Sequence, residues 1–381
     1  MIKKNFKDIK LSALGLGCMR FPTKGDDKSK IDMDAVREMV AYAIENGINY
    51  FDTAWGYHSG ASEGAIGEIL GDYPRDSFYL ATKFPGYSAA NLERVAEIFE
   101  EQLKRCGVEY FDFYLFHNVC ETNIDNYLDP KYGILDYLLE QKKNGRIRHL
   151  GFSTHGTIDT VRRFLDAYGE HLEFCQIQLN WLDYKMQNAK AKVELLRERN
   201  IPIWVMEPLR GGKLARLEPE HEALLKHHRP EASPVEWAFR YLQSIEGVTA
   251  TLSGMSNMEQ LRDNIATFES EKPLSKSELE TLSSIVTKMT EKTSLPCTAC
   301  RYCTDYCPKG IDIPNIIELY NEDAYSGGSF LAPLAIGALP EDKRPSACIG
   351  CRSCEEVCPQ NIKISEMMSN FTERLKKDED D

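Results

Sequence analysis

The stretch INYFDTAWGYHSGASEGAIGEILGDYPRDSFYLATKF, residues 48–84, decides the fold class. It contains an apolar run at 48–54, a helix-period pattern at 63–70 and a second apolar run at 78–84. Short apolar runs that alternate with helical patterns are typical of parallel βαβ units. The stretch therefore predicts one strand–helix–strand unit, and the chain repeats this unit on both sides of it.

The same alternation extends from about residue 10 to residue 268. The expected strands are 11–17, 48–54, 78–84, 111–117, 147–153, 174–179, 201–206 and 248–253. The expected helices are 34–46, 63–70, 92–105, 134–143, 158–168, 188–198, 234–244 and 258–268. Eight such units in about 260 residues predict a (β/α)8 TIM barrel of the α/β class rather than an open doubly wound sheet.

Composition and charge exclude several classes of protein. Of the 381 residues, 42% are hydrophobic and 28% are charged, as in ordinary globular proteins. A net charge of −13 argues against nucleic-acid binding, which needs a basic surface. Residues 1–10 lack the apolar core of a signal peptide, and the weakly polar stretch 327–340 is too short to span a bilayer. We expect a cytoplasmic protein with no nucleic-acid or membrane partner.

Eight of the twelve cysteines form two copies of one pattern. The spacing C-x2-C-x2-C-x3-C-P starts at Cys297 and recurs 51 positions later at Cys348. This spacing is typical of bacterial ferredoxins with two [4Fe–4S] clusters, in which the fourth cysteine of each run ligates the other cluster. One predicted cluster is held by Cys297, Cys300, Cys303 and Cys358, and the other by Cys348, Cys351, Cys354 and Cys307.

Zinc ligation and disulfide bonds fit the cysteine spacing less well than clusters do. Zinc uses two pairs of thiolates, and the third C-x2-C step and the trailing C-P have no function in a zinc site. Structural disulfides are rare in the cytosol. We expect a barrel over residues 1–270, a connector over 271–295 with a helix at 276–289, and a dicluster domain over 296–381. Forty residues between the two runs favour a mostly helical domain.

Four polar side chains lie where a barrel places its active site, at the C-terminal ends of strands. Asp52 ends one expected strand and Tyr57 follows it, Lys83 ends the next, and His117 ends the one after. Each residue alone could have an ordinary role as a cap, a surface charge or a core histidine. An acid, a phenol, an ammonium and an imidazole from three successive strand ends predict a catalytic site.

These side chains suit the reduction of a carbonyl group. A hydride adds to carbon while negative charge develops on oxygen, so a proton donor must lie beside that oxygen. Tyr57 is the predicted donor, and we expect the ammonium of Lys83 to lower the pKa of the phenol. Asp52 would hold Lys83 in place, and His117 would orient the carbonyl oxygen.

The segments GINYFDTAWGYHSGASEGAIGEIL, YLATK, FDFYLFHN and GFSTHG resemble the successive strand-end motifs of the aldo-keto reductase family. Together with the cysteine runs, the chain resembles the iron–sulfur-containing branch of that family. The resemblance covers residues 10–268 and implies an NAD(P)H-dependent oxidoreductase acting on a small aldehyde or ketone.

The resemblance also implies a set of cofactor contacts. Ser153, Thr154 and Gln176 would hold the nicotinamide amide, Met206 would stack on the ring, and the loop 207–213 would cross the pyrophosphate. The adenosine end would lie along the segment after the last strand, where Arg262 or Arg210 could replace absent basic residues. The complete expected set is Met19, Arg20, Ser153, Thr154, Gln176, Met206, Glu207, Leu209, Gly211, Gly254, Gln260 and Asn264. NADP(H) and NAD(H) are both left open.

The two halves of the chain imply different electron chemistry. Nicotinamide transfers two electrons as hydride, whereas an iron–sulfur cluster transfers one electron at a time. The clusters could be structural or regulatory, could exchange electrons through FMN bound at the barrel mouth, or could carry electrons from ferredoxin or another redox protein. The alternative function is a ferredoxin-linked electron-transfer protein whose barrel is a cofactor platform.

Overall fold

The protein is described from a computed structural model, which covers residues 1–291, 294–297, 300–328, 331–358 and 360–380. Residues 292 and 293 of the expected connector, and Pro359 of the second cysteine run, lie outside the described residues. The chain forms two compact units. The first contains Met1–Asp183 and Ala189–Leu282, and the second contains Tyr184–Asn188 and Ser283–Asp381.

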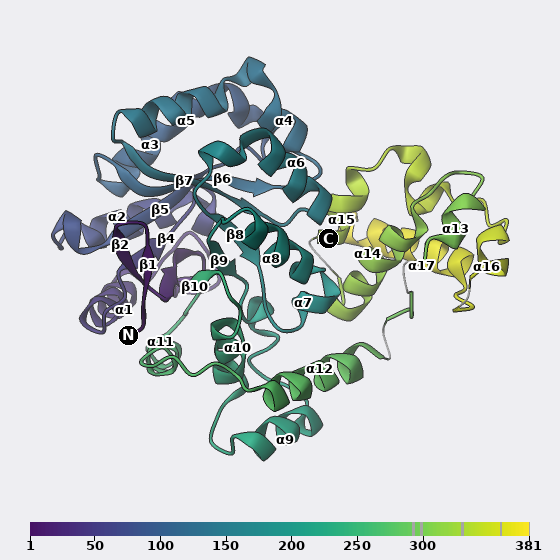
Figure 1. The fold of residues 1–381 in the computed structure, drawn as a ribbon. Helices are drawn as coiled ribbons and strands as arrows, with labels where there is room; N and C mark the ends of the chain where they lie inside the picture. The colour runs from purple at the N-terminus through teal and green to yellow at the C-terminus, as the bar shows by residue number, and fades with distance from the viewer. Residues whose placement is uncertain (292–293, 298–299, 329–330, 359, 381) are drawn as a thin grey trace. The chain divides into compact units, whose positions relative to one another are not determined.

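The first unit is built on a closed barrel of eight parallel strands (Figure 1). Its strands are β3 (Leu14–Gly17), β4 (Tyr50–Asp52), β5 (Tyr79–Phe84), β6 (Phe111–Val119), β7 (Ile147–Thr154), β8 (Cys175–Gln178), β9 (Ile203–Met206) and β10 (Val248–Ser253). Each strand pairs with the next one in the sequence, and β10 pairs with β3 to close the ring. The predicted (β/α)8 barrel is confirmed.

Helices follow the strands as expected. They are α1 (Met33–Glu45), α2 (Ser62–Leu70), α3 (Val95–Cys106), α5 (Ile134–Lys143), α6 (Ile158–Tyr168), α8 (Ala189–Glu198), α10 (Pro234–Gln243) and α11 (Met258–Thr267). Local chemistry sets several of their ends. Ser233 caps α10 by accepting the N–H of Glu236 at 3.1 Å, and Gly107 ends α3 in the left-handed conformation that favours glycine.

Three short helices were not expected: α4 (Ile124–Leu128), α7 (Asp183–Met186) and α9 (Pro219–His228). They lie in connections after β6, β8 and β9, where loops of a barrel vary most freely. The predicted connector helix is present as α12 (Lys276–Glu291).

An N-terminal hairpin corrects the expected first strand. The predicted strand 11–17 is divided, because Leu11 and Ser12 belong to β2 (Ile9–Ser12), which pairs antiparallel with β1 (Lys3–Phe6). Phe6 packs edge-on against Trp204, with ring centroids 5.0 Å apart, in the hydrophobic cluster at the N-terminal ends of the barrel strands. The hairpin thus contributes to the core at the end of the barrel opposite the active-site loops.

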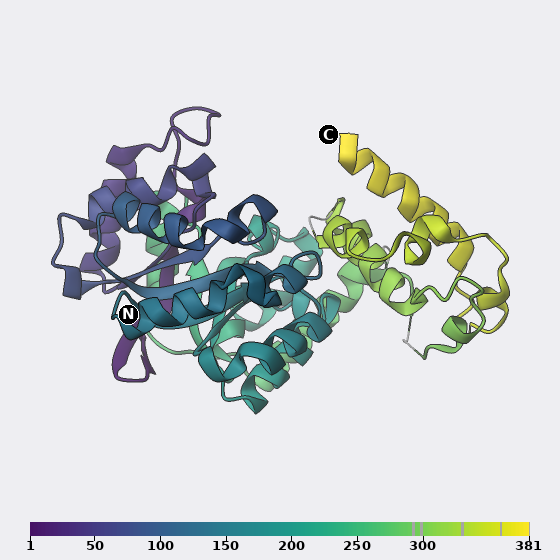
Figure 2. The ribbon, with the colours of Figure 1, turned by 90° about the horizontal axis from the view of Figure 1, so that it is seen from above.

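The second unit is helical, and its regular elements within the described residues are all helices. They are α13 (Tyr302–Asp305), α14 (Ile313–Ser326), α15 (Leu331–Gly337), α16 (Ser353–Glu356), α17 (Ile364–Asp380), short 3-10 turns, and the parts of α7 and α12 that belong to this unit. Figure 2 shows α17 as the long helix at the C-terminal end. The sequence repeat is visible in the backbone, since Arg301 and Arg352 both adopt left-handed φ angles, of 64° and 62°, one residue before α13 and α16.

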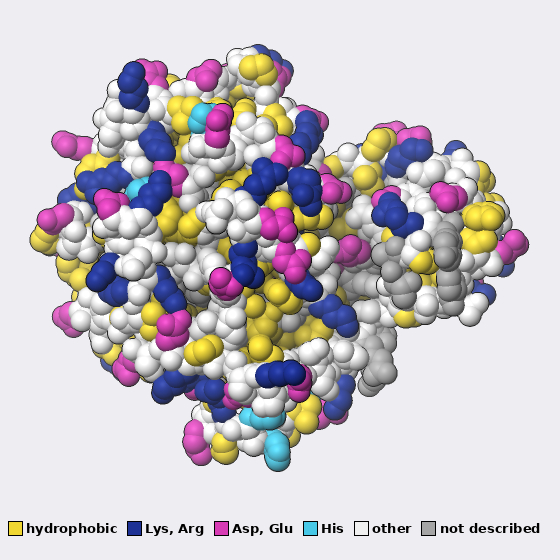
Figure 3. All heavy atoms as spheres, in the orientation of Figure 1, with side chains coloured by type: hydrophobic (Ala, Val, Ile, Leu, Met, Phe, Trp, Pro, Cys, Tyr) yellow, Lys and Arg dark blue, Asp and Glu magenta, His cyan; other side chains and the backbone are white. Residues whose placement is uncertain are grey.

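Charged side chains of both signs are interspersed on the face of the molecule seen in Figure 3. Many form surface ion pairs, for example Arg37 with Glu68 at 2.9 Å. Within the described part of the chain, no helix combines the length and the apolar character needed to cross a membrane.

Candidate active site

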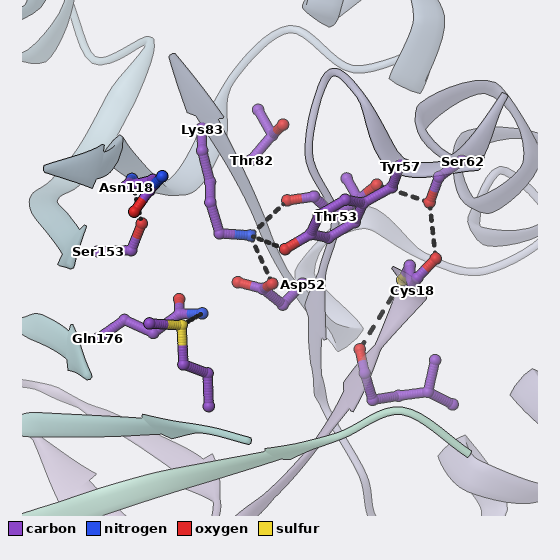
Figure 4. A network of polar contacts seen from close by, with 12 residues as sticks. Cys18, Asp52, Thr53, Tyr57, Ser62, Thr82, Lys83, Asn118, Ser153 and Gln176 are labelled. Atoms are coloured by element: carbon purple, nitrogen blue, oxygen red, sulfur yellow. Dashed lines mark hydrogen bonds and ion pairs between the residues drawn. The ribbon is translucent and has the colours of Figure 1, made fainter. Parts of the chain in front are cut away.

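Three of the four predicted catalytic residues meet around one buried ammonium group (Figure 4). The Lys83 Nζ donates to Asp52 Oδ1 at 2.6 Å, to the Thr53 carbonyl at 2.7 Å and to the Tyr57 hydroxyl at 3.4 Å. The Lys83 side chain is 0% exposed and that of Asp52 is 3% exposed. An ion pair this deeply buried is costly to form unless its remaining hydrogen bonds are satisfied, and here the ammonium has all three of its donors engaged.

The backbone around Tyr57 is held in an unusual conformation. Tyr57 begins a short turn, Tyr57–Gly60, in which His58 and Ser59 adopt left-handed φ angles of 53° and 55°. The His58 ring fixes this turn, because its Nε2 accepts the N–H of Phe21 at 3.1 Å and its Nδ1 lies 2.8 Å from the Lys28 carbonyl. The phenol is therefore positioned by contacts from the segment after β3.

A second layer of buried polar groups supports the strand that carries Lys83. Gln102 of α3 donates to the Lys83 carbonyl at 3.0 Å and to Glu63 Oε1 at 2.7 Å. Glu63 also accepts from Thr82 at 2.7 Å, and Tyr114 donates to Gln102 Oε1 at 2.6 Å. These contacts join α2, α3, β5 and β6 behind the ammonium and restrict its movement.

The electrostatics of the site differ in one respect from the expectation. Lys83 does act to lower the pKa of the Tyr57 phenol, but burial outweighs this effect, so the pKa lies above its ordinary value. Burial also raises the pKa of Asp52, although Lys83 opposes the rise. For Lys83 itself, burial lowers the pKa, but attraction to Asp52 and Tyr57 outweighs it and the net direction is upward. The phenol is thus protonated and the ammonium charged near neutral pH.

His117 lies beside the phenol as a neutral imidazole. Burial, followed by the charge of Lys83, lowers its pKa well below the ordinary value. Its ring is 6.0 Å from that of Tyr57 and 5.2 Å from that of Tyr87, both measured between centroids and both edge-on. Its Nδ1 is buried without a hydrogen-bond partner among the described residues. Tyr87, 42% exposed, was missed in the sequence, although its place just after a strand end is the relevant signal.

The residues expected to hold the nicotinamide amide are on adjacent strands, but they differ in whether their polar atoms already have hydrogen-bond partners. Ser153 of β7 and Gln176 of β8 are register partners, and the Gln176 Nε2 lies 3.8 Å from the Met206 sulfur. Gln176 Oε1 is buried and has no partner among the described residues. The Thr154 hydroxyl is instead engaged within the protein, donating to the Val119 carbonyl of the neighbouring strand β6 at 2.6 Å and accepting the N–H of Gly156 at 2.9 Å.

Asn118 was also missed as a site residue. It directly follows His117 and, like Gln176, has a buried side-chain oxygen that lacks a partner within the described structure. Its backbone N–H donates to Ser153 Oγ at 2.8 Å, and Figure 4 shows the two residues together beside the site. It ends the segment FDFYLFHN, but that segment alone assigns no role to its side chain.

Several residues of the expected cofactor-binding set come together between β3, β9 and β10. The Arg20 guanidinium lies 4.0 Å from the Glu207 carboxylate, and a Cβ at Gly254 would come within 3.1 Å of the Arg20 side chain. Gly211 has a φ of 65°, which favours glycine. It lies in a tight turn that is closed by the bond from the Gly212 N–H to the Leu209 carbonyl at 3.0 Å. Met19, next to Arg20, is 53% exposed.

The segment expected at the adenosine end is stabilised mainly by its own contacts. Gln260 Oε1 accepts the N–H of Ser256 at 2.8 Å, and the buried Asn264 donates to Ser253 Oγ at 3.2 Å. Of the two candidate arginines, Arg210 is buried and its Nε lies 3.0 Å from Asp183, so it serves to hold its loop. The guanidinium of Arg262 lies over the ring of Tyr42 at 5.4 Å.

Seven of the eight cysteines of the repeated spacing fall into two groups in the second unit. Burial, with the nearby thiols of Cys297, Cys300 and Cys358, raises the pKa of Cys303 to about 11. Burial likewise raises the pKa of Cys354 to about 12, and the neighbouring thiols there are Cys307 and Cys348. Each set thus contains a cysteine from the other run.

The donor set fits an iron–sulfur cluster. Cys297, Cys300, Cys303 and Cys358 line one cavity together with apolar side chains that include Ile317 and Ile362. Within the described ranges, no three His, Cys, Asp or Glu side chains converge on a point that could hold a single metal ion. A cubane is ligated at four separate iron corners, so its thiolates surround a volume instead of meeting at a point.

Comparisons with known proteins agree with this architecture. The sequence model of the aldo/keto reductase family matches residues 13–287, and that of the 4Fe-4S dicluster domain matches residues 296–363. The chain is 30% identical over 260 residues to a probable aldo-keto reductase 1 of Glycine max, covering 65% of this chain and 71% of the relative. It is also 30% identical over 224 residues to the NADH-specific methylglyoxal reductase of Escherichia coli, covering 54% and 66%.

Solved structures show the same barrel. The holo form of aldo-keto reductase AKR11C1 from Bacillus halodurans superposes with a TM-score of 0.60 at 25% identity, covering 75% of this chain and 96% of that one. The family match extends over more than half of the chain. The chain therefore belongs to the aldo/keto reductase family, as an NAD(P)-dependent oxidoreductase that carries a ferredoxin-type iron–sulfur domain.

Proposed function

We propose that the protein reduces the carbonyl group of a small aldehyde or ketone to an alcohol. The observation that carries this proposal is the buried Asp52–Lys83–Tyr57 chain of contacts beside the neutral ring of His117. A bound nicotinamide would supply the hydride for this reaction. The residues of the chain supply proton transfer, orientation and charge.

Tyr57 is the proposed general acid. Its pKa is raised by burial, so the phenol carries the proton that the substrate oxygen needs. The ammonium of Lys83, 3.4 Å from the hydroxyl, stabilises the phenolate that remains after the proton has left. Asp52 compensates the charge of Lys83 and fixes its position. His117 is proposed to orient the carbonyl oxygen, because a neutral imidazole can donate a hydrogen bond without competing for the proton.

The proposed cofactor is NADH or NADPH. The partnerless oxygen of Gln176 and the adjacent Ser153 and Met206 fit the amide and ring of a nicotinamide. Arg20 and Arg262 are the proposed basic contacts for the phosphates. The Arg20 side chain is 48% exposed and lies 4.0 Å from Glu207, whereas Arg210 is buried against the buried Asp183 at 3.0 Å. The Escherichia coli relative is named as a reductase of methylglyoxal with NADH, which makes methylglyoxal a reasonable first substrate to test.

The second unit is proposed to hold two [4Fe–4S] clusters with crossed ligation. The proximity of Cys358 to Cys303, and of Cys307 to Cys354, supports this assignment. An external one-electron carrier, ferredoxin or another redox protein, is the proposed partner of these clusters, and bound FMN is a further candidate for coupling them to the nicotinamide.

One observation favours the alternative of an electron-transfer protein. Tyr306 and Ile349, which are 57% and 61% exposed, lie next to the cysteines Cys307 and Cys348 assigned to one cluster. Exposed apolar side chains are often found where proteins associate. The complete Asp52–Tyr57–Lys83–His117 set favours catalysis in the barrel, since a cofactor platform has no need of a proton donor.

The test is anaerobic purification followed by NADH- and NADPH-dependent reduction of methylglyoxal and other carbonyl compounds. Tyr57→Phe should lower turnover by roughly 10²–10⁴-fold, the usual contribution of a general acid, while cofactor affinity is unchanged. Tyr132→Phe, on a loop outside the site, is the matched control and should retain wild-type turnover. Full activity of Tyr57→Phe would refute the assignment.

A further inference from the structure

Strand β6 contains one extra residue at its C-terminal end. Phe116 pairs with Phe152 of β7, and Val119 pairs with Thr154, so two residues of β6, His117 and Asn118, face the single residue Ser153. Two residues opposite one is the defining feature of a β-bulge, and bulges beside active sites redirect side chains. A regular strand would point His117 and Asn118 to opposite faces. The bulge allows both to contribute to the site.

The backbone of Asn118 is fixed from both sides. Its φ is 54°, a left-handed conformation that asparagine tolerates better than most residues. Its N–H donates to Ser153 Oγ at 2.8 Å, and its carbonyl accepts from Asn123 Nδ2 at 2.7 Å. With its N–H and its carbonyl bonded to the side chains of Ser153 and Asn123, the Asn118 backbone is held in place before any ligand binds.

The polar atoms that remain without partners define a ligand. Asn118 Oδ1 and Gln176 Oε1 are both buried acceptors without a hydrogen-bond donor among the described residues. Asn118, Ser153 and Gln176 lie on the neighbouring strands β6, β7 and β8. The Ser153 hydroxyl accepts the Asn118 N–H, and Ser153 is paired in register with Gln176. Adjacent strands are about 4.8 Å apart, and the two acceptors belong to residues on the strands that flank β7. A buried acceptor without a donor is costly, so this pair calls for a group with two N–H donors.

We propose that Asn118 is a cofactor-binding residue, and that Asn118 Oδ1 and Gln176 Oε1 accept the two N–H groups of the nicotinamide amide. This inference rests on the proposed nicotinamide-dependent function. In this proposal Asn118 takes the role expected of Thr154, whose hydroxyl is already bonded to Val119 and Gly156. A carbonyl substrate could not replace the amide here, because a carbonyl oxygen is itself an acceptor and offers no donor to Asn118.

The test compares two cofactors in the full-length, cluster-loaded protein. One is NADH, and the other is its analogue in which the ring amide is replaced by an acetyl group, which lacks both N–H donors. Wild-type protein should bind NADH more tightly than the analogue, measured by quenching of intrinsic fluorescence. Asn118→Gly keeps the left-handed backbone but removes the oxygen, and we expect it to weaken NADH binding by about 5–10-fold.

The discriminating result is the preference between the two cofactors. Asn118→Gly should bind the analogue as the wild type does, so its preference for NADH should fall by the same factor. Asn118→Asp retains an acceptor oxygen and should keep more of the preference. Asn200→Gly is the matched control, because Asn200 is an exposed asparagine with a φ of 56° remote from the site, and it should behave as the wild type.

Three results would contradict the proposal in different ways. An unchanged preference in a folded Asn118→Gly protein would overturn the role of Asn118 alone. If Asn118→Gly does not fold, the Asn118→Asp variant becomes the test. Equal affinity of that variant for NADH and for the acetyl analogue would overturn the acceptor role. Absence of NADH and NADPH binding by the wild type would overturn the proposed function and this inference with it.

Discussion

The barrel site and the cysteine-rich unit prepare for their ligands in different ways. In the barrel, the ammonium of Lys83 is already bonded to Asp52, Thr53 and Tyr57. In the second unit, the thiols of Cys303 and Cys354 are members of the hydrophobic core and lie beside further thiols. The ammonium of the first site is already bonded within the protein, although Asp52 Oδ2 and His117 Nδ1 lack partners among the described residues. The second unit places ligand atoms where a core would otherwise have apolar ones.

This difference distinguishes a cofactor that binds and dissociates from clusters that form part of the folded unit. The barrel can bury its own charges without the nicotinamide, so the cofactor can enter and leave during turnover. The core of the second unit, built from residues such as Ile313, Ile316 and Phe371, closes around the cysteines. A small unit with its ligands inside the core gains much of its folding free energy from the metal group. We expect the barrel to fold without its cofactor and the second unit to depend on its clusters.

Removal of iron should have the largest effect and should fall on one unit. After chelation under oxidising conditions, the second unit should lose most of its helical structure, while the barrel keeps a cooperative thermal transition. Circular dichroism and calorimetry measure the two contributions. Cys303→Ser should lose about half of the iron and Cys120→Ser none of it. Retention of full helicity by iron-free protein would show that the clusters are not structural.

Replacement of Lys83 should have the next largest effect, within the barrel. Lys83→Met leaves the buried Asp52 without its counter-charge, which should lower the free energy of unfolding by about 3–5 kcal/mol. Denaturant unfolding measures this loss. The double variant Asp52→Asn/Lys83→Met should recover part of it, because no unpaired charge remains. Equal stability of Lys83→Met and the wild type would show that Asp52 is neutral in the folded protein.

A smaller effect is expected from the layer behind the ammonium. Gln102→Leu removes the bonds to the Lys83 carbonyl and to Glu63, and leaves a buried carboxylate with fewer donors. We expect a stability loss of about 1–3 kcal/mol together with lower turnover. Gln243→Leu, at the C-terminal end of α10, is the comparison variant. If turnover falls without any loss of stability, the layer acts on catalysis alone and does not support the barrel.

The smallest effect is expected from pH within the neutral range. The proposed reduction needs the protonated phenol of Tyr57, whose pKa burial raises above its ordinary value, and the neutral ring of His117, whose pKa burial lowers well below its ordinary value. Protonated Tyr57 is lost only as pH rises through its raised pKa, and neutral His117 only as pH falls through its lowered one. We therefore expect kcat/KM for reduction to be nearly constant between about pH 7 and about pH 9. A steep decline within that window would show that another group controls proton transfer.

The sequence predicted the barrel and the Asp52, Tyr57, Lys83 and His117 set for the same reason. Parallel strands and helices alternate with a recognisable period, and a barrel brings all of its strand ends to one face. The N-terminal hairpin was not predicted, because its strands have only four residues each. Phe6 packs against Trp204 and Phe113, which are far along the chain. Periodicity carries no information about such contacts.

The predictions for individual contacts were less complete. Thr154 was expected to face the cofactor, yet its hydroxyl is engaged by Val119 of the neighbouring strand and by Gly156. Asn118 was overlooked, because its orientation depends on a bulge that exists only through pairing with β7. The direction of the Tyr57 pKa also required the structure, since the opposing effects of burial and of Lys83 can be weighed only when the depth of the site is known.

By itself, the sequence determined the alternation that forms a barrel, the four polar residues at its strand ends and the crossed cysteine spacing. Each of these depends on residue types at fixed intervals along the chain. Tertiary structure alone decided which polar atoms remain without partners and which charges are buried. Those properties depend on distances between segments that are remote in sequence, and such distances exist only after the chain has folded.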